Sequence, residues 1–177
     1  RSIEAFPNGF FRLGEVTCEI TGGATPLGAE YPESGVRFFR VQNVMQNYID
    51  DSDMAFITER DDAELERSRL KTDDVLLTIT GVSYGKAAVV PADFAGSNIN
   101  QHSVRIELDQ SRLHPLVLST FLNSAVGKGL SDQNITGVTR PALDYQAIRR
   151  FRVPRFSGRF QRKVEQTVKR AQDEFAT

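Results

Sequence analysis

Short runs of apolar residues predict β-strands over much of the chain. Near the N-terminus, within residues 10–20, Val16, Cys18 and Ile20 alternate with polar residues, the period-two pattern of a strand with one buried face. The segment that follows, residues 21–35, contains several glycines and prolines that break this pattern. We therefore expect one strand followed by a long flexible loop.

A second strand is predicted for residues 36–44, which are rich in β-branched and aromatic side chains. Side chains alternate between the two faces of a regular strand. Phe39 and Val41 are therefore expected to share one face, and Arg40 and Gln42 the other.

Two further apolar runs, residues 74–80 and 86–91, are separated only by residues 81–85, which include two glycines. Such a short connection between two buried-strand patterns predicts a β-hairpin. Residues 103–108 alternate strictly between apolar and polar side chains and predict another strand with one buried face. The expected sheet is therefore mostly antiparallel.

The helices are predicted from a different period. Apolar residues recur three and four positions apart over residues 115–126, which predicts an amphipathic helix that covers the sheet and ends near Gly127 and Gly129. Residues 58–68 carry acidic side chains near their start and arginines near their end, an order that suits the helix dipole and predicts a short exposed helix. A further helical turn is expected within residues 143–150.

The chain is expected to divide into a core domain, residues 1–154, and a helical tail, residues 155–177. A short strand at residues 151–154 closes the core. One apolar stripe runs along the otherwise charged tail. The residues expected to pair with a second helix are Phe160, Val164, Val168 and Phe175. The alternative is that this stripe folds back onto the core domain.

Composition fits a folded, soluble chain. With 40% hydrophobic and 25% charged residues, the 177-residue sequence has the make-up of a globular protein with one core. No apolar run approaches the length of a membrane span, and the first residues resemble neither a signal peptide nor a translation start. We expect a piece of a longer cytoplasmic protein. The single cysteine and two widely spaced histidines predict no disulfide, metal site or cofactor.

Charge is distributed unevenly, although the formal net charge is only -1. Residues 50–74 contain ten acidic and four basic side chains, whereas residues 140–177 contain ten basic and four acidic ones. A solvated acidic turn and a basic helix face account for this asymmetry as well as a nucleic-acid contact does. Charge therefore leaves the function open, but it argues against a broadly basic protein that binds DNA regardless of sequence.

Three kinds of catalytic or nucleotide-binding site are disfavoured. The chain lacks the glycine-rich cofactor loop and the Asn/Asp-Pro-Pro-aromatic stretch of an amino-methyltransferase. Asp73 and Asp74 resemble the start of a nuclease metal site, but an aspartate that opens a buried strand after a turn is common for reasons of local hydrogen bonding. Residues 81–86 lack the spacing and the following helix of a phosphate-binding P-loop. No catalysis by this chain is expected.

Polar residues at the tip of the predicted hairpin are candidates for contact with nucleic acid. Ser83, Tyr84 and Lys86 offer a hydroxyl group, an aromatic ring and an ammonium group beside backbone amides. This combination suits a phosphate backbone. A plain hairpin turn is the alternative.

Three amide side chains, Asn98, Asn100 and Gln101, cluster before a predicted strand. Asn and Gln bind the edge of adenine in the major groove through two hydrogen bonds, whereas asparagines before a strand are also ordinary turn residues. Arg140 is open to two interpretations as well. Its guanidinium suits a guanine edge or a phosphate, and it equally suits an ion pair with Asp144.

Taken in chain order, eight short motifs resemble type I restriction-modification specificity subunits. They are Gly14-Glu-Val, Thr21-Gly-Gly-Ala-Thr-Pro, Arg37-Phe-Phe-Arg-Val-Gln-Asn-Val, Leu70-Lys-Thr-Asp-Asp-Val-Leu-Leu-Thr-Ile-Thr-Gly, Tyr84-Gly-Lys-Ala, Asn98-Ile-Asn-Gln-His, Gly137-Val-Thr-Arg and Val153-Pro. Each motif is degenerate, but eight in this order are far more specific than any one. The resemblance spans roughly residues 13–154, and the helix that follows is also in place.

The resemblance implies an α+β target-recognition domain over residues 1–154, with a twisted, mostly antiparallel sheet and packed helices, and the start of an amphipathic spacer helix over residues 155–177. Complete subunits carry two recognition domains and two spacers. This chain therefore corresponds to a half-subunit that dimerises, an excised domain, or the recognition module of a fused restriction-methylation enzyme. The implied partners are double-stranded DNA, methyltransferase and restriction subunits or fused equivalents, and a second recognition domain or a second copy of the chain.

On this interpretation, loop residues read base edges in the major groove while basic residues hold phosphates. The expected contact residues are Thr25, Arg37, Arg40, Gln42, Ser83, Tyr84, Lys86, Asn98, Asn100, Gln101, Thr139 and Arg140. Two alternatives stay open. One is an enzyme fragment with an unrecognised methyltransferase or nuclease site, and the other is a protein-interaction module of this fold that does not bind DNA.

Overall fold

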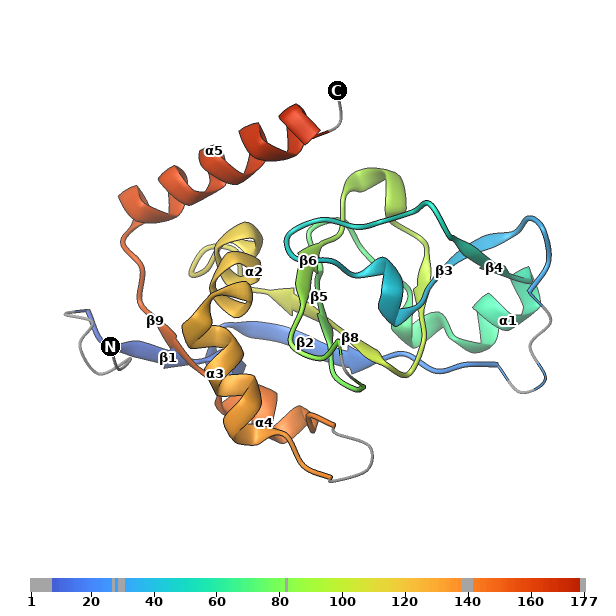
Figure 1. The fold of residues 1–177 in the computed structure, drawn as a ribbon, viewed down its shortest axis with the longest axis horizontal. Helices are drawn as coiled ribbons and strands as arrows, with labels where there is room; N and C mark the ends of the chain where they lie inside the picture. The colour runs from blue at the N-terminus through green and yellow to red at the C-terminus, as the bar shows by residue number, and fades with distance from the viewer. Residues whose placement is uncertain (1–7, 27, 29–30, 82, 138–141, 176–177) are drawn as a thin grey trace.

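The computed structural model describes residues 8–26, 28, 31–81, 83–137 and 142–175. An antiparallel four-stranded sheet lies at the centre of the molecule (Figure 1). In spatial order its strands are β2 (Thr17–Gly22), β8 (Ser103–Leu108), β5 (Val75–Thr78) and β6 (Ala87–Val89). The predicted hairpin is confirmed, because β5 and β6 pair antiparallel, and so is the strand at residues 103–108.

Two smaller sheets flank the central one. The three-stranded sheet joins β4 (Ala55–Ile57), β3 (Val36–Phe39) and β7 (Asn98–Ile99), and the β3–β7 pair is parallel. The two-stranded sheet joins β1 (Phe10–Arg12) to β9 (Arg152–Pro154), so that two segments about 140 residues apart in the sequence lie side by side. The predicted α+β fold with mostly antiparallel pairing is therefore confirmed.

Helices cover the sheets on several sides (Figure 1). They are α1 (Glu59–Glu64), α2 (Pro115–Asn123), α3 (Ala125–Asn134), α4 (Tyr145–Arg150) and α5 (Gly158–Phe175). The predicted helix within residues 58–68 begins as α1, and Thr58 caps it by accepting a hydrogen bond from the Asp61 N–H. The helical turn expected within residues 143–150 is present as α4.

Strand β5 is buried on both faces because it stands between two cores. Val75 and Leu77 belong to the main core, which α2 covers with Leu118 and Leu122. Leu76 points to a second core between the four-stranded and three-stranded sheets. This double burial explains why residues 75–78 read as a continuous apolar run rather than an alternating one.

Two details of the predicted strands are wrong. Val16 and Ile20 are buried as expected, but Cys18 is exposed, because a bulge between Thr17 and Glu19 shifts the register of β2 against β8. The strand predicted for residues 36–44 ends at Phe39, and a 3₁₀ helix at Val41–Asn43 follows.

The shorter strand changes which residues share a face. Phe38 and Phe39 are both buried, each in a different core, so that the strand has no solvent-facing aromatic side. Val41 is only half-buried and does not share a strand face with Phe39. The tertiary packing of two cores around one short strand overrides the alternation.

The predicted end of the helix near Gly127 and Gly129 is also wrong. The helix stops at Asn123, and Ser124 caps a new helix, α3, which runs through both glycines. A Cβ atom at Gly127 would overlap the backbone of Phe121 and Leu122. Gly127 therefore permits α3 to pack closely against the end of α2 and does not act as a helix stop.

Helix α5 lies above α2 in Figure 1 and contacts it. Val164 packs against the main core, and the rings of Phe156 and Phe160 stack with centroids 5.0 Å apart. Near the other end, Gln172 Nε2 donates to the carbonyl oxygen of Asn47 at 2.7 Å. Among the described helices, none is long and apolar enough to cross a membrane.

Candidate nucleic-acid interface

Several loops that carry predicted contact residues meet at one edge of the four-stranded sheet. Strands β2 and β5 end at this edge, and β8 begins at it, because β2 and β5 each pair antiparallel with β8. Gly22 lies opposite Val104, and Thr78 lies opposite Ser103. We call this edge the loop edge. It comprises residues 23–26, 79–81, 83–86, 100–102, 136–137 and 142–143.

Backbone hydrogen bonds tie these loops to one another. The Ile79 N–H donates to the His102 carbonyl, and the Leu143 N–H donates to the Ile79 carbonyl, both at 2.9 Å. Thr80 and Ala142 form an isolated antiparallel bridge. Segments far apart in the sequence are thereby held in fixed positions, which is what a recognition surface requires.

Two adjacent glycines allow the loop after β2 to approach its neighbours closely. A Cβ atom at Gly23 would overlap the carbonyl oxygens of Ile99 and Asn100. A Cβ atom at Gly22 would overlap the hydroxyl group of Tyr145 on α4. The Gly-Gly pair in this motif therefore serves the packing of the loop edge.

Two pairs of side chains bond to each other across the loop edge. Thr25 Oγ1 donates to Gln101 Oε1, and both residues are exposed. Thr80 Oγ1 lies 2.6 Å from His102 Nδ1, and both of these residues are half-buried. Thr25 and Gln101 were expected contact residues, whereas Thr80 and His102 were not, because no sequence pattern connects two residues that are 22 positions apart.

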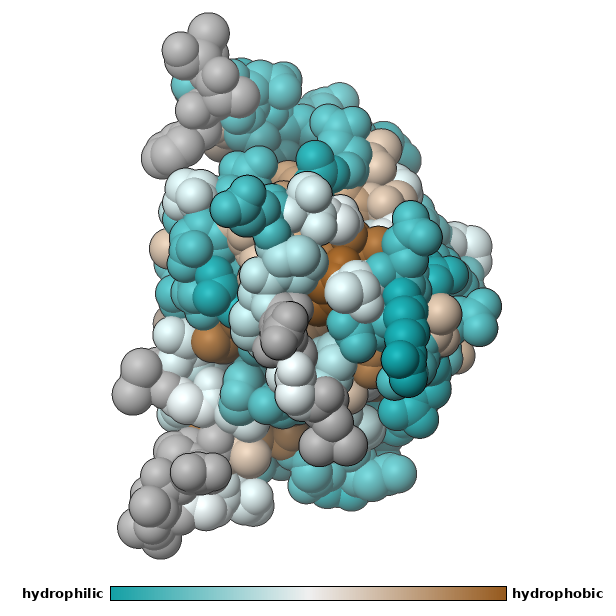
Figure 2. Space-filling model, turned by 90° about the vertical axis from the view of Figure 1, so that its right-hand side faces the viewer, coloured by the Kyte–Doolittle hydropathy of each residue, from teal (hydrophilic) through white to brown (hydrophobic). Residues whose placement is uncertain are grey.

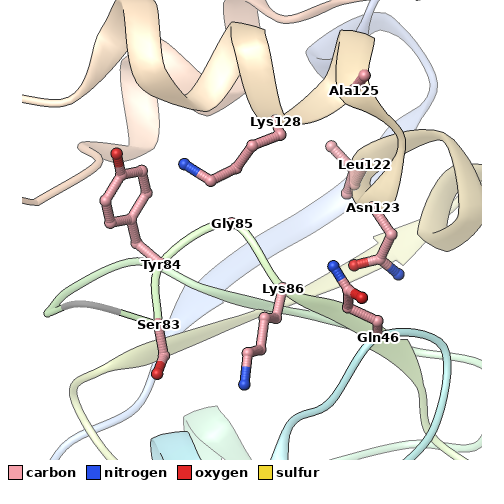
Figure 3. A pocket seen from close by; sticks show the side chains of 9 residues that line it. All are labelled: Gln46, Ser83, Tyr84, Gly85, Lys86, Leu122, Asn123, Ala125 and Lys128. Carbon is pink, nitrogen blue, oxygen red and sulfur yellow. The ribbon is translucent and has the colours of Figure 1, made fainter.

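The hairpin tip lines a hollow of about 350 Å³ (Figure 3). Ser83, Tyr84 and Lys86 lie on the hairpin side of this hollow. Lys86 Nζ approaches the Met45 sulfur at 3.5 Å and, within the described part of the chain, has no carboxylate partner. Lys86 is half-buried, and no carboxylate of the described residues uses the bonding capacity of its ammonium group.

A second lysine, Lys128 of α3, lines the same hollow but is already engaged. Its ammonium group lies 4.0 Å from the centre of the Tyr84 ring and pairs with Asp132. The Tyr84 hydroxyl also donates to Asp132 Oδ1 at 2.8 Å. Burial opposes the charge of Lys128, but its bonds to Asp132 and Tyr84 outweigh burial and raise its pKa, while Lys128 and Tyr84 lower the pKa of Asp132.

Three other predicted contact residues lie away from the loop edge, on the three-stranded sheet and the 3₁₀ helix after it. Arg37 donates to the Asp93 carbonyl at 2.8 Å, and its guanidinium lies 5.2 Å from the centre of the Phe94 ring. Arg40 and Gln42 both bond to the carboxylate of Asp53. This side of the molecule is mostly hydrophilic around a hydrophobic area (Figure 2).

Asn98 and Asn100 act as turn and packing residues, the alternative that their sequence position left open. Asn98 is 0% exposed, donates to Asp62 Oδ1 at 2.9 Å and accepts from Ser68 Oγ at 2.6 Å. Its side chain has no surface to offer a base, so the interpretation of Asn98 as a contact residue is wrong. Asn100 is also buried, and its Oδ1 accepts from the backbone N–H of His102.

The proposed roles of Thr139 and Arg140 fall outside the described residues. The alternative partner of Arg140, Asp144, accepts a hydrogen bond from the Ala147 N–H at 2.8 Å and thereby caps α4.

Asp74 belongs to a set of charged side chains, from buried Asp74 and Arg105 to exposed Lys71, that we call the charge network. Arg105 is its centre and pairs with Asp74 at 3.3 Å, with Glu107 at 3.5 Å and with Glu19. Lys71 Nζ bonds to Glu107 at 2.7 Å, and the Lys71 N–H donates to Asp74 Oδ2 at 2.8 Å. Within this network the two terminal guanidinium nitrogens of Arg105 have carboxylate partners, whereas its buried Nε has no hydrogen-bond partner among the described residues.

The geometry of Asp74 favours a structural role over a nuclease site. Its side chain is buried, and burial raises its pKa even though Lys71 and Arg105 oppose this effect. Over the described residues, no group of three or more His, Cys, Asp or Glu side chains is arranged to hold a metal ion. The hydrogen bond from the Lys71 N–H is the local bonding expected of an aspartate after a turn.

Comparison with known proteins gives one curated relative by sequence, whereas no protein-family model matches the chain. The chain is 26% identical over 122 residues to the specificity subunit of the type I restriction enzyme EcoBI from Escherichia coli. The match covers 69% of this chain and 25% of the relative. The chain thus corresponds to about a quarter of that protein.

Solved structures show the same fold. A structure of a type I R-M system, described by its complex assembly and conformational transition, matches 98% of this chain and 42% of its own with a TM-score of 0.65 at 17% identity. The HsdS subunit from Thermoanaerobacter tengcongensis matches 96% of this chain and 39% of its own, with a TM-score of 0.63 at 18% identity. In sequence the chain is therefore similar to a type I restriction-modification specificity subunit, and in fold to structures of a type I R-M system and of an HsdS subunit, which is the resemblance that its ordered motifs predicted.

Proposed function

We propose that this chain recognises a sequence in double-stranded DNA and directs methyltransferase and endonuclease partners, separate or fused, to that site. The observation that carries the proposal is the loop edge, where exposed polar side chains from distant segments are held together on a specificity-subunit fold. Catalysis belongs to the partners in this proposal. The cytoplasm is the compartment where such partners and DNA meet.

The residues divide into two kinds of contact. Lys86, at the hairpin tip, binds a backbone phosphate, and Ser83 and Tyr84 line the same hollow. Thr25 and Gln101 are exposed at the loop edge and read base edges. This division follows the general rule that phosphate contacts position a protein while base contacts specify the sequence.

The remaining expected residues take secondary places in the proposal. Arg37 in strand β3, and Arg40 and Gln42 just after this strand, are outlying candidates because they lie away from the loop edge. Thr139 and Arg140 stay candidates on the strength of their motif alone. Alanine variants of these residues distinguish the two kinds of contact. Loss of a base contact changes the preference at one base pair, whereas loss of a phosphate contact weakens binding to all sequences equally.

The helical tail, from residue 155 onward, is the start of a spacer in this proposal. Phe160 is exposed and Val168 is half-buried, so both keep apolar surface for a second helix while Val164 packs on the core domain. Phe175, whose side chain lies outside the description, completes the proposed pairing face. The partner is a second recognition domain or a second copy of the chain.

Selection from a randomised duplex pool, with salt titrated, tests the proposal. We expect enrichment of one short sequence and an affinity that falls as salt rises, because phosphate contacts release counterions. Absence of both enrichment and salt dependence would favour a protein-interaction module. Incubation with DNA, magnesium and labelled S-adenosylmethionine is the matched control, and cleavage or label would favour an enzyme fragment instead.

A further inference from the structure

His102 has a fixed position at the loop edge. Its backbone N–H donates to Asn100 Oδ1 at 3.1 Å, and its carbonyl accepts from the Ile79 N–H at 2.9 Å. Its ring atom Nδ1 lies 2.6 Å from Thr80 Oγ1. Both the backbone and the ring of His102 are therefore held in one orientation.

The second ring nitrogen, Nε2, remains open to a further partner. It bonds to none of the described residues, and the His102 side chain is only half-buried. The two ring nitrogens of a neutral histidine divide the roles of donor and acceptor. When the Thr80 hydroxyl donates to Nδ1, the proton lies on Nε2 and a donor points outward.

DNA presents acceptors that match such a donor. Its phosphate oxygens and the N7 and O6 atoms of purines all accept hydrogen bonds. We propose that His102 is a DNA-contact residue that donates from Nε2, and that Thr80 is a positioning residue that fixes its tautomer. This inference rests on the proposed function and adds two named residues to it.

Two variants of similar size separate a DNA contact from a structural role. His102→Gln places an amide nitrogen near the position of Nε2, whereas His102→Asn places a polar atom near Nδ1, the atom that faces Thr80. If His102 contacts DNA, the Gln variant keeps binding that the Asn and Ala variants lose. If the ring serves only to hold Thr80 in place, the Asn variant keeps more DNA binding than the Gln variant.

The test uses the full 177-residue chain and the randomised duplex pool. For a base contact, we expect His102→Asn and His102→Ala to lose about 5- to 150-fold in discrimination at one base pair. For a phosphate contact, we expect weaker binding of every sequence with unchanged preference. Either result supports the inference, whereas unchanged binding in all three variants or the reversed order overturns it. If the wild-type chain itself enriches nothing, the proposed function fails first.

The positioning role of Thr80 has a readout that does not depend on DNA. The chain contains only two histidines, so long-range ¹H–¹⁵N spectra resolve the ring nitrogens of His102 beside those of His114. We expect Thr80→Val to change the tautomer population of His102 but not that of His114, and Thr80→Ser to restore it. An unchanged population in Thr80→Val would overturn the role of Thr80, and urea unfolding verifies that each variant is folded.

Discussion

The loop edge and the charge network lie on the same four-stranded sheet but use their polar atoms in opposite ways. In the charge network, Arg105 is 4% exposed and meets carboxylates from three directions. At the loop edge, Thr25 and Gln101 bond to each other yet remain exposed, and Lys86 has no carboxylate partner among the described residues.

This difference separates stability from binding. A charged side chain that is buried among its partners is not accessible to a ligand, and removal of one partner leaves the other charge uncompensated. An exposed group on a fixed loop contributes little to folding but keeps its bonding capacity for a ligand. Substitutions in the two regions should therefore have different effects, which the following predictions order from the largest to the smallest.

The largest effect is expected for Arg105→Met. The change leaves the buried carboxylate of Asp74 without its cation, and we expect the free energy of unfolding to fall by about 3 to 5 kcal/mol. The midpoint of urea unfolding, at an unchanged slope, measures this loss. Arg105→Met combined with Asp74→Asn should recover much of it. If Arg105→Met alone lowers the free energy of unfolding by less than about 1 kcal/mol, the charge network does not differ from the loop edge in its contribution to stability.

Gly23→Ala should have the next largest effect, although it lies at the loop edge. The new Cβ would overlap two backbone carbonyl oxygens that have no room to move, so we expect a loss of about 1 to 3 kcal/mol in unfolding free energy. Gly22→Ala is the matched control, because the atom in its way belongs to the side chain of Tyr145. Tyr145→Ala should rescue Gly22→Ala in thermal unfolding but leave Gly23→Ala unchanged.

Lys86→Ala should leave stability unchanged and weaken DNA binding. Loss of one phosphate contact reduces the slope of log affinity against log salt by about 1 and affects all sequences alike. Lys128→Ala is the control in the same hollow, since Lys128 is already paired with Asp132. Equal slopes for the wild type and Lys86→Ala would count against the phosphate role of Lys86.

The smallest effect is expected for Lys71→Gln and depends on pH. The bond from Lys71 holds the pKa of Glu107 below its ordinary value of 4.5. A carboxylate whose pKa is lowered by folding stabilises the folded protein at pH values above its ordinary pKa. This stabilisation is lost as the pH falls through the lower pKa of the folded state. Lys71→Gln should therefore reduce unfolding free energy at neutral pH, by less than about 1 kcal/mol for such a partly exposed pair, and make the acid-side loss shallower. Urea midpoints measured across this pH range check both signs.

Periodicity in the sequence predicted those elements whose environment is simple. Residues 103–108 pair on both sides, with apolar side chains on the face toward the main core and polar side chains on the other face, so their alternation is visible. Cys18 broke the same rule because a bulge is a property of a strand pair and not of one strand. Gly127 looked like a helix stop because its close approach to α2 is visible only in three dimensions.

The candidate site was predictable only in part, because the sequence shows the chemistry of each side chain but not its tertiary contacts. Turn chemistry and side-chain type identified Lys86, Thr25 and Gln101 as polar loop residues. Asn98 has the same chemistry, but its burial depends on Asp62 and Ser68, which are distant in sequence. The bond between Thr80 and His102 is equally non-local. Local chemistry thus names the candidates, and only tertiary contacts decide which of them keep an accessible atom.

The bulge in β2 also has a practical consequence. It turns the side chain of Cys18, the only cysteine of the chain, toward solvent. Cys18 lies about 13 Å along the strand from Gly22, where the loop edge begins. A fluorophore attached there through a maleimide would report the approach of a labelled duplex by energy transfer, without mutagenesis and without obstructing the site.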